Sequence, residues 1–378
     1  MFDDTLSLVF FVVFALITFL ELLYYYILYA RFAFKKPSKD PRESDEMPPV
    51  SVIMVVRDAA AVLLKTLPRL LNQHYPCFEL VIVNDKSQDD TKLLLLEYQQ
   101  QYDNIHIVNL DTAKTSVRGN KYAMSIGVRC AKYDNIVFTD AECAPSSVHW
   151  LEQMAGRFTD RTHIVLGYST YLKRKNPFNR LLHFDTMFSA MQYFSLALAH
   201  STYRGDHKNI GFTKELFYSQ KGFAAHNHLV YGDEDIFISK AGKKCHTAIT
   251  YSPDSHTVLQ RPAQYSYWVH HKEGLLYTRK YNTFKNKFLL NVYSYINLLF
   301  YVSLVFAVLF TMHNVVAVSI VVSIAFLRIL SMYLVLGFSA KRLNEKQIIP
   351  ALLVYDLIFS ILNPLYWISA HLHHQRFE

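Results

Sequence analysis

Apolar residues form two kinds of segment in this chain: short runs in its middle and long runs near both ends. The first long run, Leu6 to Ala30, has no lysine or arginine and a single charge at Glu21. It is long enough to cross a bilayer, which takes about 20 apolar residues in a helix. Three more long runs follow near the other end: 289–310, 315–338 and 348–371. We therefore expect one span before the middle of the chain and three after it, the last weakened by Asp356 and Pro364.

A cleaved signal peptide is the other interpretation of the first apolar run. The residues before the run include Asp3 and Asp4, whereas a signal peptide begins with basic residues. The apolar core is also too long, and no small-residue cleavage site follows it. The run is therefore expected to remain as a membrane anchor.

Basic residues beside the spans predict their orientation, because loops rich in lysine and arginine stay on the cytoplasmic side. Such clusters occur at 31–39, 279–287 and 341–346. All three lie on one side of the membrane if the N-terminus is outside. The middle of the chain, about residues 40 to 285, is then cytoplasmic. We expect a multi-pass protein of the inner (cell) membrane.

The formal net charge is +8, and the basic residues cluster beside the spans. We therefore attribute the excess charge to anchoring at an anionic membrane surface. The sequence contains no basic helix and no aromatic RNP-type strand, so nucleic acid is not expected as a partner.

Between the spans, apolar runs of strand length alternate with segments of helical periodicity. The expected strands are 50–56, 79–83, 105–108 and 136–138, and the expected helices are 59–72, 90–101 and 120–130. This alternation predicts an α/β domain with a mainly parallel sheet and helices on both faces. The expected division is an N-terminal span (1–36), a charged linker (37–49), the α/β domain (50–285) and a C-terminal membrane region (286–378).

Polar residues follow three of the expected strands: Arg57-Asp58, Asn84-Asp85 and Asp140-Ala141-Glu142. Ligands of such sheets bind at the carboxyl ends of the strands, so these residues should converge. Two carboxylates one residue apart point the same way if the extended geometry continues. Their repulsion is relieved by a cation, and hard oxygen ligands suit Mg²⁺ or Mn²⁺.

The alternative for the segment 135–150 is an acid at a strand end followed by an acid that caps a helix. Pro145 and the two serines after it are expected to open that helix, with Trp150 as its first apolar residue. The chain contains neither G-x-G-x-x-G nor G-x-x-x-x-G-K-[ST], so the signatures of dinucleotide-binding and P-loop proteins are missing.

Five stretches, in this order along the chain, resemble those of family 2 glycosyltransferases. They are VSVIMVVRDAA (50–60), LVIVNDKSQDDT (80–91), RGNKYAMSIGVRCAKYDNIVFTDAEC (118–143), GDHKNIGFTKELF (205–217) and YGDEDIF (231–237). The resemblance covers about residues 50 to 280, and the flanking spans suit the membrane-bound bacterial members. It implies a GT-A fold, Rossmann-like with a mainly parallel sheet, in a cytoplasmic domain flanked by transmembrane helices. The implied donor is a UDP- or GDP-linked sugar, and the implied cofactor is Mg²⁺ or Mn²⁺.

The resemblance also implies roles for individual residues. Those expected to bind the donor nucleotide are Arg57, Asp58, Asp85, Asp89, Lys121 and Asp140. Those expected to hold the metal are Asp140 and Glu142, where glutamate replaces the second aspartate of the family's D-x-D site. Asn120 departs from the basic residue that the family carries before Lys121.

The acidic series Asp233-Glu234-Asp235 resembles the family's catalytic segment, with Asp233 preferred as the general base and the other two left open. A carboxylate within reach of the acceptor hydroxyl takes its proton as it attacks the anomeric carbon. Attack opposite the leaving group inverts the configuration. The alternative is a solvated acidic helix start, which the helix dipole favours.

Acceptor contacts are expected from Asn209, Gln264 and Trp268. The segment from Gln264 to Trp268 fits the Q-x-x-R-W of processive synthases, except that Tyr267 replaces arginine, which disfavours processive synthesis. In a second register, W-x-x-Q-K, His271 replaces glutamine. Trp268 either stacks on a sugar or lies at the membrane interface.

The apolar and aromatic segment Leu181 to Ala199 is interrupted by His183 and Asp185, so it is not expected to span the membrane. A core helix is one interpretation. The other is a helix on the membrane surface that shapes the site for a lipid-linked acceptor.

These features predict a membrane-anchored inverting glycosyltransferase that acts on a lipid-linked or polysaccharide acceptor at the cytoplasmic face. One alternative is a processive polysaccharide synthase. Another is a non-catalytic membrane scaffold, which the substitutions at Asn120, Glu142 and Tyr267 favour. A transporter is disfavoured because the spans are expected to hold no paired intramembrane charges.

Overall fold

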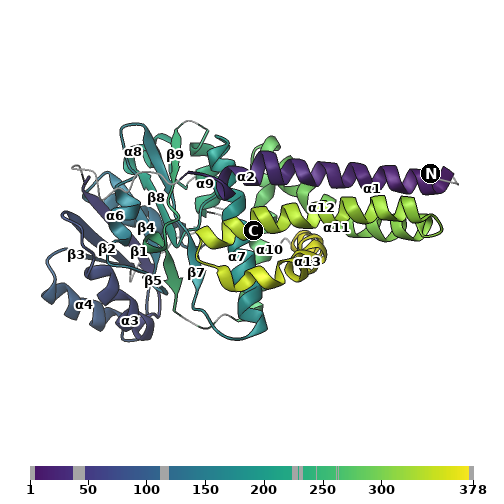
Figure 1. The fold of residues 1–378 in the computed structure, drawn as a ribbon. Helices are drawn as coiled ribbons and strands as arrows, with labels where there is room; N and C mark the ends of the chain where they lie inside the picture. Colours follow the sequence, from purple (N-terminus) through teal and green to yellow (C-terminus); the bar gives the residue numbers. More distant parts are fainter. Residues whose placement is uncertain are drawn as a thin grey trace.

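A computed structural model gives the fold, with an α/β domain at one end and a bundle of long helices at the other (Figure 1). It describes residues 5–36, 47–110, 119–223, 229, 233–243, 245–260, 262 and 264–373. The N-terminal helix runs beside the other long helices and reaches the tip of the bundle farthest from the sheet.

A mixed, mainly parallel sheet forms the centre of the α/β domain, as the alternating pattern predicts. Its seven strands lie in the order β3-β2-β1-β4-β8-β6-β9. Their bounds are β1 Val50–Val56, β2 Phe78–Asn84, β3 Ile105–Asn109, β4 Asn135–Asp140, β6 Thr162–Leu166, β8 Asn209–Thr213 and β9 His246–Ile249. Strand β8 runs antiparallel to both of its neighbours, and the other pairs are parallel. The central strands are rich in valine and isoleucine because helices cover both of their faces.

A second sheet has three short strands, in the order β5 (Cys143–Pro145), β10 (Thr257–Leu259) and β7 (Ser169–Tyr171). The prediction that Pro145 opens a helix is wrong, because residues 143–145 pair with β10. Helix α6 begins only at Trp150 (Trp150–Ala155). The local sequence does not reveal the pairing, because the partner strand comes much later in the chain.

The three expected helices between the first strands are present as α3 (Ala60–Leu71), α4 (Thr91–Gln101) and α5 (Lys121–Cys130). Helix α5 lies close to the sheet at Gly127, where a Cβ atom would come within 2.6 Å of the Ile53 side chain. The remaining helices of the domain are α8 (Lys214–Ser219), α9 (Asp233–Ala241) and α10 (Tyr265–Thr278).

Four helical segments are long and apolar enough to cross a membrane, one before the sheet and three after it, in agreement with the four expected spans. The first comprises α1 (Thr5–Leu23), a π-helical turn (Tyr24–Tyr29) and α2 (Ala30–Ala33). The others are α11 (Phe284–Thr311), α12 (Val315–Arg342) and α13 (Leu352–Leu372), the last preceded by a 3₁₀ turn (Lys346–Ala351). They expose large apolar side chains, such as Phe19, which is 57% exposed.

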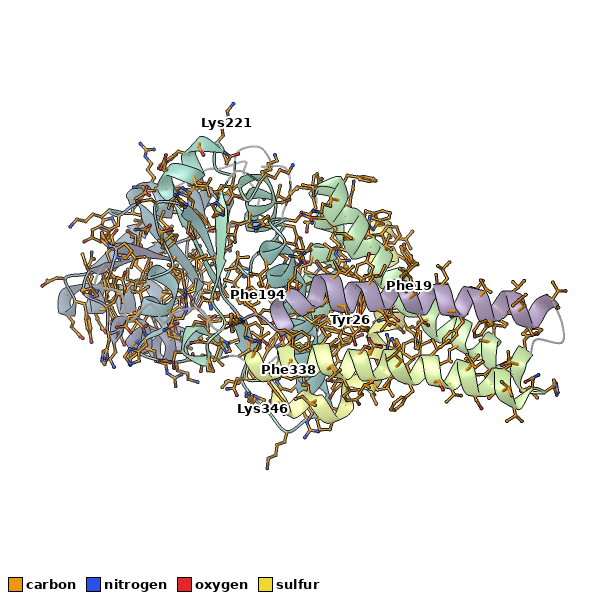
Figure 2. The ribbon with its side chains drawn as sticks, turned by 45° about the horizontal axis from the view of Figure 1, so that its top comes forward. Phe19, Tyr26, Phe194, Lys221, Phe338 and Lys346 are labelled. Carbon is orange, nitrogen blue, oxygen red and sulfur yellow. The ribbon has the colours of Figure 1, made fainter. Side chains whose placement is uncertain are left out.

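Helix α7 (Pro177–Leu198) lies between the sheet and the long helices, and it is buried on nearly every side. The Asn176 side chain caps it by accepting a hydrogen bond from the Asn179 amide at 2.6 Å. Where the α/β domain meets the long helices, the ring centroids of Phe194 and Phe32 lie 5.1 Å apart, and Figure 2 labels Phe194. The core-helix interpretation of this segment is therefore confirmed, and a continuous apolar core joins both halves of the molecule.

A buried cluster of charged and polar side chains links helices α1, α11, α12 and α13. The guanidinium of Arg328 (α12) lies 2.6 Å from Glu21 (α1) and 2.7 Å from Asp356 (α13). Arg328 also donates to Asn297 at 3.0 Å, and Tyr301 donates to Asp356 at 2.6 Å. The prediction that the spans hold no paired charges is wrong, because these residues meet only after the helices pack. The cluster's charges are paired with each other and shielded from solvent, so it holds the helices together.

Replacing Arg328 by methionine would keep much of the side-chain volume but leave two carboxylates buried without a cation. Breaking a buried ion pair from one side costs about 3–5 kcal/mol, so we expect the free energy of unfolding in detergent to fall by about that much. The control is Lys341→Met, at the exposed end of the same helix. It should change the free energy by less than about 0.5 kcal/mol. Equal effects of the two substitutions would contradict a structural role for the cluster.

Candidate active site

Two of the expected acids lie at one edge of the main sheet. Asp140 is the last residue of β4, and Asp85 directly follows β2. Strand β1 lies between these two strands, with Val55 paired to Asp140 and Val56 paired to Asn84. Among the residues that the structure describes, no side chain forms a hydrogen bond or ion pair with the Asp85 carboxylate. That carboxylate is therefore free to bind a ligand at this edge.

Other residues expected to bind the nucleotide hold the neighbouring loops together. Asp58 accepts a hydrogen bond from the Gln88 amide at 2.7 Å, and Asp89 accepts one from the Ala60 amide at 3.1 Å. The loops after β1 and β2 are thereby joined. The Arg57 side chain is 65% exposed and lies 4.0 Å from Asp58.

The backbone turns directly after Asp140. One oxygen of Asp140 accepts a hydrogen bond from the Glu142 amide at 2.8 Å, so the extended geometry expected for these two residues does not continue. The other oxygen lies 3.9 Å from Nε2 of His207, and a third of the Asp140 side chain remains exposed (33%). One oxygen of Asp140 is thus engaged in the turn, whereas the other lies near His207 on a partly exposed side chain.

The chemistry of Asp140 and Glu142 fits a divalent ion of the Mg²⁺ or Mn²⁺ type, because carboxylate oxygens are its preferred ligands. Within the described parts of the chain, no three histidine, cysteine or acidic side chains come together as a metal cage. Joint coordination of such an ion by Asp140 and Glu142 stays a prediction.

Three charged or titratable residues, Asp206, His207 and Lys208, lie just beyond the end of β4. They directly precede β8, which runs antiparallel to β4, with Asn209 paired to Thr139. Lys208 Nζ lies 3.3 Å from Asp206 Oδ1, and His207 lies between Asp206 (3.8 Å) and Asp140 (3.9 Å). These residues therefore form a series of contacts that begins at Asp140 and ends at Lys208.

The electrostatics of these residues follow from their burial and spacing. Burial alone would raise the pKa of Asp206, but the neighbouring Lys208 and Arg204 charges hold it well below its usual range. Burial would likewise lower the pKa of Lys208, yet the Asp206 charge raises it. Burial and the Lys208 charge lower the pKa of His207 to about 4. At neutral pH the site therefore holds an ionised pair beside an uncharged imidazole.

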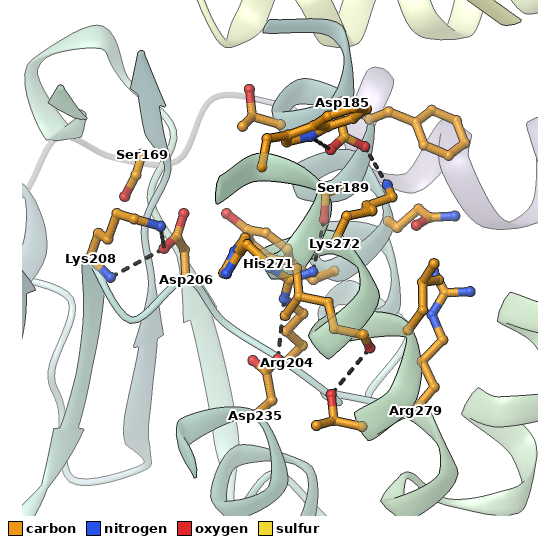
Figure 3. Close-up of a pocket in the computed structure, with 18 of the residues that line it drawn as sticks. Ser169, Asp185, Ser189, Arg204, Asp206, Lys208, Asp235, His271, Lys272 and Arg279 are labelled. Atoms are coloured by element: carbon orange, nitrogen blue, oxygen red, sulfur yellow. Dashed lines mark hydrogen bonds and ion pairs between the residues drawn. The ribbon is translucent and has the colours of Figure 1, made fainter. Parts of the chain in front are cut away.

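A cavity lies between this edge and helices α7 and α10, and Figure 3 shows its charged lining. Asp235 of α9 lines it and lies 3.5 Å from Arg204. On its other side, Asp185 accepts a hydrogen bond from Trp268 Nε1 at 2.8 Å and forms an ion pair with Lys272. Trp268 therefore lines the cavity as a buried side chain.

Asn209 and Gln264 lie away from this cavity. Asn209 is fully buried, and its amide donates to the carbonyl oxygens of Tyr168 (2.9 Å) and Ser255 (2.8 Å). It also accepts a hydrogen bond from Trp150 Nε1 at 3.1 Å, so its side-chain amide is engaged inside the protein. Gln264 is exposed directly before α10 and is not among the cavity residues.

Lys121 is buried, and its ammonium group donates to the backbone carbonyl of Leu229. It does not line the cavity. Asp233 and Glu234 begin helix α9, but their side chains lie outside the described residues, as do Tyr231 and Gly232. Asp235 is therefore the member of the acidic series whose described side chain faces the cavity.

Sequence reasoning did not assign roles to Arg204, Asp206, His207 and Lys208. One signal was available: charged residues that directly precede a buried strand next to a strand ending in an acid. The antiparallel pairing of β8 with β4, which brings these residues to the edge, has no local signature.

His256 directly follows Ser255, whose backbone carbonyl accepts a hydrogen bond from the Asn209 amide. It is 4% exposed, and its Nε2 atom lies 3.1 Å from the carbonyl oxygen of Tyr251. Burial lowers the pKa of His256 to about 4. This imidazole is therefore uncharged in the folded protein at neutral pH.

Comparisons with known proteins agree with the fold. Residues 51–222 match the family model described as Glycosyl transferase family 2. Hyaluronan synthase from Pasteurella multocida is 29% identical over 125 residues, which are 32% of this chain and 12% of that protein. The probable glycosyltransferase YdaM from Bacillus subtilis is 27% identical over 139 residues, 34% of this chain and 33% of that protein. The matches thus span a third or less of these relatives.

Among solved structures, the mannosyltransferase PcManGT from Pyrobaculum calidifontis has a TM-score of 0.57 and 20% sequence identity. The match covers 93% of this chain and 99% of that one, whose structure is a complex with GDP-Man and Mn²⁺. This similarity confirms the expected fold class, a GT-A domain accompanied by long apolar helices.

Replacing His256 by glutamine should flatten the pH dependence of stability between about pH 4 and 6.5. In that range the unfolded imidazole binds a proton that the folded one rejects, so wild-type stability should rise with pH. Denaturant unfolding of the detergent-solubilised protein across this range measures the slope. His313→Gln, at an exposed imidazole, is the control. An unchanged slope in His256→Gln would contradict the assignment.

Proposed function

Since the α/β domain matched over residues 51–222 belongs to the family 2 glycosyltransferases, we propose that this protein transfers a sugar from a nucleotide-sugar donor to a lipid-linked or polysaccharide acceptor. The main observation behind the proposal is the convergence of Asp85 and Asp140 at one sheet edge. Beside this edge lies a cavity that is partly lined by the membrane-type helices, by which we mean the four helical segments long and apolar enough to cross a membrane.

The donor nucleotide binds at the sheet edge in this proposal. Asp85 contacts the nucleoside, and Asp140 and Glu142 are the residues that would hold a divalent ion beside the donor. The similar fold of a protein solved with GDP-Man and Mn²⁺ supports this arrangement. The bound ion would neutralise charge that develops on the leaving diphosphate. Contacts of Arg57, Asp58, Asp89 and Lys121 with the nucleotide remain predictions.

The acceptor hydroxyl enters from the cavity and attacks the anomeric carbon. A bond forms between the acceptor oxygen and that carbon as the bond to the diphosphate breaks. The hydroxyl proton passes to a carboxylate at the start of α9. Asp235 is our first choice, because its side chain lines the cavity beside Arg204, and Asp233 remains the alternative. Attack from the face opposite the leaving group inverts the anomeric carbon.

We further propose that the domain lies on the cytoplasmic side of the cell membrane. Four helices of sufficient length and the basic clusters beside them support this orientation. There, soluble nucleotide sugars reach the sheet edge while the helices hold the cavity next to the bilayer.

A processive synthase is the second candidate, because two relatives are named as synthases. Besides the hyaluronan synthase, the poly-β-1,6-N-acetyl-D-glucosamine synthase of Staphylococcus epidermidis is 26% identical over 100 residues. Tyr267, which replaces the arginine of Q-x-x-R-W, is exposed and its ring stacks with that of His271. Product length separates the candidates: long polymers support processive synthesis, and addition of one sugar supports single transfer.

Substitution of the edge acids tests the proposal. In membranes supplied with radiolabelled UDP- or GDP-sugars and Mn²⁺, Asp85→Asn and Asp140→Asn should each lower incorporation by about 100-fold or more, since they remove charge contacts to the donor. The control is Asp103→Asn, at an exposed loop acid, which should retain wild-type activity.

Wild-type activity in the Asp85 and Asp140 variants would contradict the assignment of these residues to the donor site. Calorimetry addresses the non-catalytic scaffold directly. If the purified wild-type protein binds no nucleoside diphosphate in the presence of Mn²⁺, the enzymatic proposal fails and the scaffold is favoured.

A further inference from the structure

Most of the charged side chains that line the cavity form ion pairs with one another. Each of three acids that line it is matched with one cation: Asp206 with Lys208, Asp235 with Arg204, and Asp185 with Lys272. The distance is 3.3 Å for the first pair and 3.5 Å for the second. These contacts neutralise six of the charges that line the cavity.

Arg279 is a further cation in the cavity lining, directly after α10. Its guanidinium forms no hydrogen bond or ion pair with any residue that the structure describes, and no dashed line reaches it in Figure 3. Burial lowers its pKa, and the nearby Arg204 charge lowers it further. A partly buried guanidinium beside a like charge is costly unless an anion compensates it.

The other residues that line the cavity indicate what kind of anion Arg279 would bind. Ser294 of α11 and Asn363 of α13 also line the cavity. Helices α11 and α13, two of the four that are long and apolar enough to cross a membrane, therefore form part of the wall of the cavity that Arg279 lines, whereas Asp85 lies at the sheet edge.

We propose that Arg279 binds the phosphate of an amphiphilic ligand whose apolar tail lies along the membrane-type helices. The planar guanidinium can donate two parallel hydrogen bonds to phosphate oxygens, which suits this headgroup. That the ligand is the sugar acceptor rests on the proposed function, whereas the binding of the headgroup does not.

Binding to the purified full-length protein in a neutral maltoside detergent tests the site, with dodecyl phosphate as the probe. Loss of a charge-assisted hydrogen-bond pair should weaken its binding by about tenfold or more in Arg279→Gln. Lys285→Gln removes an exposed cation from the same basic cluster and should bind like wild type. Arg279→Lys, which keeps the charge, should fall between wild type and Arg279→Gln if all variants remain folded by gel filtration.

Two further probes identify the source of the phosphate. Inorganic phosphate should bind far more weakly than dodecyl phosphate, because it lacks the tail. Binding of UDP or GDP with Mn²⁺ should be unchanged in Arg279→Gln. If that binding is instead lost, Arg279 belongs to the donor site and the proposal is overturned.

Equal affinity of wild type and Arg279→Gln for dodecyl phosphate would also overturn the proposal, as would the absence of binding to wild type. If wild type binds dodecyl phosphate in an Arg279-dependent manner but no nucleoside diphosphate, the headgroup site stands and the proposed transferase function fails. The two proposals therefore fail by different measurements.

Discussion

A charged group that leaves water needs a partner of opposite charge, and this constraint organises both halves of the molecule. In the helix bundle, Arg328 joins three helices because its guanidinium has two carboxylates within 2.6 and 2.7 Å. At the junction, Glu345 lies 2.9 Å from His183 and accepts a hydrogen bond from Thr170 at 2.6 Å. In the cavity the same requirement pairs each of the lining acids with a cation.

The contacts at the junction give the cavity its shape. Glu345 lies between the last two membrane-type helices, whereas Thr170 belongs to β7 of the small sheet. Arg342 at the end of α12 donates to the backbone carbonyl of Ala33 at 2.8 Å, so the first and third membrane-type segments are joined beside the α/β domain. Because helix α7 is buried between these parts, the domain does not move independently of the helices without exposing apolar surface.

Much of the candidate site was predictable from short-range patterns. Asp85 and Asp140 follow apolar strand-length runs, and parallel strands bring their carboxyl ends to one edge. The prediction for Asn209 was an acceptor contact or another role in the site, and its amide forms hydrogen bonds inside the protein, because buried polar groups must be hydrogen-bonded. The turn after Asp140 also differs from expectation, since its carboxylate binds the Glu142 amide.

The sequence by itself determined the first four strands, the three helices between them and the four apolar spans, because periodicity and length are local properties of the chain. It also placed the acids at the strand ends. Only the tertiary structure decided which side chains meet: Arg328 with Glu21, His207 with Asp140, and Arg279 with no described partner. Such pairings depend on the packing of helices and on the antiparallel strand β8, and no local pattern encodes the distance between residues that are far apart in sequence.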